Sequence, residues 1–86
     1  MSIIKDQEII ITSKQCRAAR ELLGWKQTDL SDASGIGIAT IADFERGSRE
    51  PIKRTLKDIR RNFEEAGIIF INNGEIGVKI DSKLID

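Results

Sequence analysis

The stretch formed by residues 27–47 restricts the fold more than any other part of the chain, because it combines helical apolar spacing with punctuating glycines. In its first half, Leu30 and Ala33 lie three residues apart, which places both on one face of a helix. Gly35 follows as the expected end of that helix, since glycine readily adopts the left-handed conformation found at helix C-termini. The pattern predicts a short helix that begins at Gln27.

The second half of this stretch predicts another short helix. Ile38, Ile41 and Phe44 recur in steps of three residues, Gly37 is acceptable as the N-cap, and Gly47 closes the segment. If Ile41 faces the core, Ile38 and Phe44 lie within about 60° of it. The outward-facing residues are Ala39, Asp43, Arg46 and, more obliquely, Ala42. Two short helices joined by a tight turn form the helix-turn-helix layout, whose outward face would meet a groove.

The length and composition favour a small binding module. The 86 residues, 40% of them hydrophobic, suffice for one domain, residues 1–86, that buries roughly 60% of the surface of its unfolded chain. A deep catalytic cleft does not fit a core of this size. The sequence contains no histidine, no nucleophile–base pair, no metal-ligand cluster and no phosphate-binding glycine loop. We therefore expect no enzymatic activity, no cofactor and no bound metal.

The charges are unevenly distributed along the chain. The formal net charge is zero, which exerts no global attraction on nucleic acid. Between positions 46 and 61, however, seven basic residues stand against Glu50 and Asp58, an excess of five positive charges. The seven are Arg46, Arg49, Lys53, Arg54, Lys57, Arg60 and Arg61. The sequence therefore predicts a local basic surface, and the remainder of the chain is acidic.

The expected compartment is the cytoplasm. No apolar run approaches the roughly 20 residues of a membrane helix, and the N-terminus, with Lys5, Asp6 and Glu8, does not resemble a signal peptide. Cys16 is the only cysteine, so it cannot form an internal disulfide, and we interpret it as a small core residue. These features predict a soluble, cytoplasmic protein that does not enter a membrane.

The segment before the helix-turn-helix predicts one further helix. Residues 9–11 form a run of three isoleucines, which is compatible with a strand. Thr12 and Gln15 have the spacing of a capping box, which predicts a helix over residues 14–23 that ends at Gly24. Trp25, the only tryptophan, follows, and we interpret it as an anchor between the first helices.

The segment after Gly47 predicts a fourth helix. Pro51 suits a helix entrance, and Leu56, Ile59 and Phe63 form one apolar stripe. Gly67 is the residue expected just beyond the helix end. The predicted helical core therefore spans residues 12–67.

Residues 68–80 predict a C-terminal β-hairpin. Asn73 and Gly74 lie between two runs rich in β-branched residues, which is typical of a two-residue type I′ turn. This turn would pair Asn72 with Glu75, and hence Phe70 with Gly77. The predicted apolar face consists of Ile69, Ile71, Ile76, Val78 and Ile80. Because an isolated hairpin is marginal in water, that face must pack on the protein's own helices, on residues 9–11 or on a second copy of the chain.

The densest pattern in the chain is Q-x-x-L-x-x-x-x-G-I-x-x-x-T-I-x-x-F-E-x-G. It is formed by Gln27, Leu30, Gly35, Ile36, Thr40, Ile41, Phe44, Glu45 and Gly47. With RAARELLGW before it and the predicted fourth helix after it, the chain resembles the Cro/phage-repressor (XRE-like) helix-turn-helix regulators over about two thirds of its length. The resemblance implies a mainly α-helical, lambda-repressor-like DNA-binding domain. Similar proteins place the third helix in the major groove, usually as dimers on palindromic operators.

The resemblance also implies roles for individual residues. Gln27 and Thr40 match phosphate-contacting positions, and Ile38, Ala39 and Asp43 occupy positions that usually face base edges. Many members carry Gln, Arg, Asn or Ser there, whereas Ile38 and Ala39 offer only apolar contact, for instance to a thymine methyl. Asp43 can accept a hydrogen bond from cytosine N4 or repel phosphate. A site with so few direct contacts would be read partly through DNA shape.

The predicted interface continues beyond the third helix. Arg46, Ser48 and Arg49 lie where the chain would run beside the phosphates, and Lys53 adds to them at the start of the fourth helix. Arg20 and Glu45 match a pair that joins the first and third helices in similar proteins; the alternative is two unrelated surface charges.

The sequence as a whole predicts a DNA-binding transcriptional regulator, most simply a repressor, acting as a homodimer on double-stranded DNA. The alternative is a protein-interaction module that keeps the fold but binds an unknown partner protein. The neutral net charge and the weakly polar third helix are compatible with that alternative.

Overall fold

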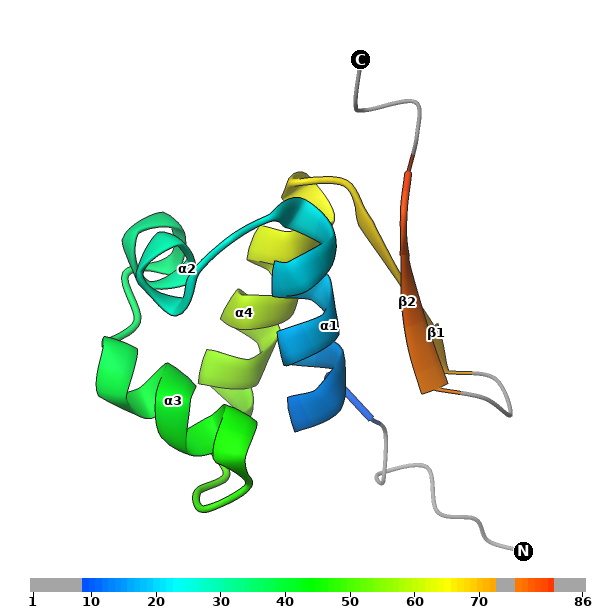
Figure 1. The fold of residues 1–86 in the computed structure, drawn as a ribbon. Helices are drawn as coiled ribbons and strands as arrows, with labels where there is room; N and C mark the ends of the chain where they lie inside the picture. Colours follow the sequence, from blue (N-terminus) through cyan, green and yellow to red (C-terminus); the bar gives the residue numbers. More distant parts are fainter. Residues whose placement is uncertain (1–8, 73–75, 82–86) are drawn as a thin grey trace, which may run out of the picture.

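The computed structural model describes residues 9–72 and 76–81, which form four helices followed by a two-stranded hairpin. The helices are α1 (Ser13–Leu23), α2 (Gln27–Ser34), α3 (Ile38–Arg46) and α4 (Lys53–Glu65). The strands β1 (Ile68–Asn72) and β2 (Ile76–Ile80) pair antiparallel. In Figure 1, α2 and α3 lie on one side of α1 and the hairpin lies on the other. The predicted mainly α-helical fold with a C-terminal hairpin is confirmed.

The helix ends follow the predicted signals. At the start of α1, Gln15 N donates to Thr12 Oγ1 and Thr12 N donates to Gln15 Oε1, each at 3.0 Å, which is the capping box. Gly35 ends α2 and Gly47 ends α3, with φ angles of 76° and 79°. Residues with a β-carbon rarely adopt such angles, so these glycines stop the helices where the spacing predicts.

The core lies between the four helices and the start of β1. Its buried apolar side chains are Ile11, Cys16, Ala19, Leu30, Ile41, Phe44, Leu56, Ile59, Phe63 and Ile68. Trp25 packs against this cluster with its ring 5.9 Å from that of Phe63, so the contact that its ring makes is with α4. The predicted stripe on α4 and the core position of Cys16 are confirmed.

Two residues predicted to face the core do not. Ala33 is exposed, because α2 is short and buries only Leu30. Ile38 is 43% exposed, because it is the first residue of α3 and the helix buries only Ile41 and Phe44 further along. Their exposure leaves more apolar surface near the start of α3 than the pattern predicts.

The predicted hairpin register is wrong by one residue. Phe70 pairs with Val78 and Asn72 pairs with Ile76, so residues 73–75 connect the strands. The predicted turn at Asn73 and Gly74 lies outside the described residues. A shift of one residue exchanges the two faces of β1, so that Ile69 is exposed instead of buried.

Contacts with α4 explain this register. Ile68 is buried, and Phe70 packs with its ring 6.2 Å from that of Phe63. The guanidinium of Arg60 lies 4.9 Å from the centre of the Phe70 ring, a cation–π contact. Phe70 therefore faces the helices together with Val78 and Ile80. Of the three possible packing partners for the apolar face of the hairpin, the protein's own helices are the one that the structure shows.

Residues 9–11 do not form a strand, although their composition is compatible with one. The carbonyl oxygen of Ile10 accepts a hydrogen bond from Arg60 Nη1 at 2.9 Å, and that of Ile9 accepts one from Asn72 Nδ2 at 3.4 Å. Side chains thus occupy backbone groups that a neighbouring strand would need, and the segment runs as an irregular chain over the core.

Candidate nucleic-acid interface

The outward face of α3 carries the residues predicted to meet base edges. Ala39 is exposed, Ile38 is partly exposed at the first position of the helix, and Asp43 is half-buried one turn beyond Ala39. Asp43 forms an ion pair with Arg46, the exposed last residue of α3. The face is therefore apolar at its start and carries a paired acid and base at its end.

The chain after α3 is fixed in position by Asp43. Both the backbone nitrogen and the hydroxyl of Ser48 donate to the carbonyl oxygen of Asp43, at 3.0 and 3.2 Å. Arg49 follows and is exposed. Ser48 and Arg49 thus lie directly beside the end of α3, as the sequence predicts.

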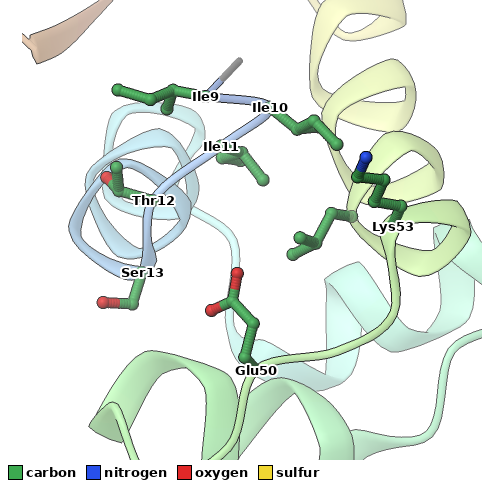
Figure 2. A pocket seen from close by; sticks show the side chains of 8 residues that line it. Ile9, Ile10, Ile11, Thr12, Ser13, Glu50 and Lys53 are labelled. Atoms are coloured by element: carbon green, nitrogen blue, oxygen red, sulfur yellow. The ribbon is translucent and has the colours of Figure 1, made fainter. Parts of the chain in front are cut away.

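Lys53 is the exposed first residue of α4, and it lines a pocket of about 440 Å³ with Glu50, Leu56 and residues 9–13. Figure 2 shows Glu50 and Lys53 on one side of this pocket and the chain before α1 on the other. Apart from Lys53, none of the residues predicted to bind DNA lines this pocket.

The two predicted phosphate-contacting residues lie in the first turns of α2 and α3. Thr40 is half-buried in α3. Gln27 is the first residue of α2, and its Nε2 donates to Glu45 Oε1 at 3.1 Å. This hydrogen bond connects the start of α2 to α3 and leaves one amide hydrogen of Gln27 for another acceptor.

Glu45 is the centre of a buried polar cluster. Arg20 Nε and Nη2 donate to its two carboxylate oxygens at 2.7 and 2.8 Å, and only 13% of the Arg20 side chain and 5% of the Glu45 side chain are exposed. Arg20 Nη1 also donates to the carbonyl oxygen of Trp25 at 3.0 Å, and Cys16 Sγ lies 3.3 Å from Glu45 Oε2. The predicted ion pair is present, and with Gln27 it joins α1, α2 and α3.

The cluster sets the protonation of its members. Burial raises the pKa of Glu45, but hydrogen bonds from Arg20, Gln27 and Cys16 outweigh it and leave the pKa below its usual value. The hydrogen bond to Glu45 raises the pKa of Arg20. Burial, followed by the charge of Glu45, raises the pKa of the Cys16 thiol. The cluster therefore consists of a carboxylate, a guanidinium and a neutral thiol.

One candidate residue was not predicted from the sequence. A pocket of about 340 Å³ lies where α1, α2 and α3 meet, and it brings Arg17 beside Gln27 and Arg46. The remaining lining residues are Arg20, Glu21, Ala42 and Glu45. The available signal was helical spacing, because Arg17 precedes Arg20 by three residues and Arg20 was expected to contact the third helix.

The described part of the chain contains neither a candidate metal site nor a helix that could cross a membrane. Among the described residues, no group of histidine, cysteine, aspartate or glutamate side chains could hold a metal ion. Within the same ranges, no helix is long and apolar enough to cross a membrane.

Comparison with known proteins identifies the family. The helix-turn-helix family model HTH_3 matches residues 17–65, a range that begins in α1 and includes α2, α3 and all of α4. A comparison with curated proteins finds no match. The matching family is a DNA-binding and not an enzymatic one. The chain therefore belongs to the Cro/phage-repressor (XRE-like) helix-turn-helix family, and in general terms it is a DNA-binding regulator.

Proposed function

We propose that the protein is a sequence-specific repressor that inserts α3 into the major groove of double-stranded DNA. The observation that carries this proposal is the outward face of α3, which presents exposed Ile38, Ala39 and Arg46 next to the exposed Arg49. A helix of this width fits the major groove, where each base pair presents a distinct pattern of chemical groups.

Phosphate contacts would fix the protein on the duplex. Gln27, Thr40, Ser48 and Arg49 border the outward face of α3 or the loop that follows it, and Lys53 would extend the interface to the start of α4. Such contacts determine the orientation of the protein without reading the sequence. A repressor bound in this way would exclude other proteins from the same stretch of DNA.

Base readout would depend on small apolar contacts. Ile38 and Ala39 can contact thymine methyl groups, and Asp43 can accept a hydrogen bond from cytosine N4. The ion pair with Arg46 lowers the cost of bringing Asp43 near the phosphates. Because these contacts are few, we expect the shape of the DNA to supply part of the specificity.

We further propose that the protein binds palindromic sites as a homodimer. Two copies on one face of the DNA would place their α3 helices about 34 Å apart, one helical turn. The hairpin surface formed by Phe70, Val78 and Ile80 packs on the protein's own helices, so the contact between copies must use another surface. The expected complex contains two protomers per operator.

Selection of bound sequences from a random DNA pool, followed by salt titration, tests this function. We expect a palindromic consensus and an affinity for it that falls steeply with salt concentration, because binding releases condensed counterions. Sedimentation of the complex should give two protomers per duplex. If the selection yields no enriched sequence and the affinity for duplex DNA does not depend on salt, the proposal is wrong.

A further inference from the structure

The pocket between α1, α2 and α3 places a basic residue of α1 beside the reading helix. Arg17 lines it from α1, Gln27 from the start of α2, and Ala42 and Arg46 from the second half of α3. The proposed interface already includes Gln27, the first residue of α2, and Arg46, the last residue of α3. Arg17 therefore lies next to surface that would contact DNA, although it precedes the helix-turn-helix in the sequence.

The charges in this pocket are not equally available to a ligand. Both oxygens of Glu45 accept hydrogen bonds from within the protein, and Arg20 donates to Glu45 and to the carbonyl oxygen of Trp25. Arg17, in contrast, is 67% exposed, and its only ion-pair partner among the described residues is Glu21, with Nε 3.4 Å from the carboxylate. Exposed pairs of this kind contribute little to stability, so an anion can replace Glu21 at small cost.

We propose that Arg17 binds a phosphate of the DNA backbone, on the strand that borders the groove occupied by α3. The inference rests on the proposed DNA binding and extends the interface to α1. A phosphate at this pocket would bind the guanidinium of Arg17 and lie near the amide of Gln27 and near Arg46, whose own guanidinium pairs with Asp43. Guanidinium groups match phosphate in charge and in hydrogen-bonding geometry.

Glu21 opposes this contact in two ways. It pairs with Arg17 in the free protein and adds a negative charge to the same pocket. Removing that charge should free Arg17 and lower the repulsion of the phosphate. We therefore expect Glu21→Gln to bind DNA more tightly than the wild type, by up to about fivefold, the range of an exposed ion pair.

Arg17→Ala and Arg61→Ala form a matched pair of variants. Arg61 is 62% exposed and lies 3.2 Å from Asp58 within α4, so its loss removes the same charge and a similar surface ion pair away from the pocket. Binding is measured over a range of salt concentrations, on the selected site and on a duplex of random sequence. Thermal melts check that both variants are folded.

The inference predicts that Arg17→Ala weakens binding to both duplexes alike and lowers the slope of log K against log salt by roughly 0.9 per bound protomer. Arg61→Ala should leave the slope unchanged. If the wild type binds DNA but the two variants have equal slopes, Arg17 contacts no phosphate, and the proposed function still stands. If the wild type binds neither duplex, the proposed function itself fails, and the inference fails with it.

Discussion

Arg20 of α1 and Glu45 of α3 are joined by two hydrogen bonds, and both side chains are almost completely buried. The same carboxylate accepts from Gln27 at the start of α2, so one acidic residue holds three helices together. This cluster fixes α3 relative to Gln27, one of the residues proposed to contact phosphate. Its integrity is therefore a condition for stability and for the proposed mode of DNA binding.

Arg20→Ala should destabilise the protein by about 3 kcal/mol or more, because it leaves the carboxylate of Glu45 buried without its charged partner. Arg61→Ala, which breaks an exposed pair within α4, should cost less than about 0.5 kcal/mol. Chemical denaturation of both variants gives the two free energies of unfolding. Equal, small losses would show that the buried pair contributes no more than a surface one.

The lowered pKa of Glu45 predicts a loss of stability in acid. Its carboxylate binds protons less readily in the folded than in the unfolded protein, so its stabilising contribution is complete above the ordinary glutamate pKa of about 4.3. That contribution disappears as the pH falls from this value through the folded-state pKa. The difference in melting temperature between wild type and Glu45→Gln should therefore shrink below about pH 4.

The exposed Glu64 provides the control for this experiment. It pairs with Arg60 within α4, so Glu64→Gln changes the net charge equally without touching the cluster. The melting temperature of the Glu64→Gln variant should stay close to that of the wild type at every pH. A constant difference between wild type and Glu45→Gln from pH 7 to strong acid would contradict the pKa argument.

Gln15 connects α1 to the hairpin and should not tolerate a negative charge. Its Oε1 accepts from Thr12 N, while its Nε2 donates to Asn72 Oδ1 at 2.8 Å and to the carbonyl oxygen of Gly77 at 3.0 Å. Gln15→Glu keeps the first contact but sets a buried carboxylate against two acceptors. We expect a loss of about 3 kcal/mol in the free energy of unfolding at pH 7, partly recovered when the carboxylate is protonated.

The variant Gln15→Met separates the effect of the added charge on stability from the effect of the lost hydrogen bonds. It removes all three contacts without introducing a carboxylate, so the difference in stability between Gln15→Met and the wild type should not depend on pH in the range where Gln15→Glu recovers. If Gln15→Glu is as stable as the wild type at neutral pH, the hairpin does not pack against α1 through this side chain.

The parts of the fold that could be predicted are those determined by local sequence. The capping box of Thr12 and Gln15 and the helix ends at Gly35 and Gly47 depend on residues within one turn, and the structure confirms them. The apolar stripe of α4 follows from helical spacing alone. Each of these signals acts over a few residues and needs no knowledge of distant contacts.

The errors concern contacts between distant parts of the chain. The hairpin register depends on the packing of Phe70 against Phe63 and Arg60, which short-range turn patterns do not contain. Residues 9–11 have the composition of a strand, but Arg60 and Asn72 bind their carbonyl oxygens. Tertiary contacts override local preference in both cases.

The site could be predicted only in part, for the same reason. The resemblance to known regulators pointed to α3 and to the Arg20–Glu45 pair, and the structure contains both the helix and the ion pair. It did not reveal that Gln27 donates to Glu45, nor that Arg17 reaches the pocket beside α3. Both facts depend on how α1 and α2 are placed against α3, and a single sequence does not contain that placement directly.

The central claim is that the outward face of α3 reads DNA, and Ala39→Glu tests it. A larger acidic side chain at this exposed position should clash with the groove and with its negative potential. The thermal stability should remain nearly unchanged, because the residue faces solvent in the free protein. Ala33→Glu adds the same charge at an exposed position of α2 and is the control.

The deciding measurement is the affinity of wild type, Ala39→Glu and Ala33→Glu for the selected DNA site and for a scrambled duplex. We expect Ala39→Glu to lose its preference for the selected site, whereas Ala33→Glu keeps a clear preference and both variants melt close to the wild type. If Ala39→Glu binds the selected site as tightly as the wild type, α3 is not the reading element, and a protein partner becomes the better account of this surface.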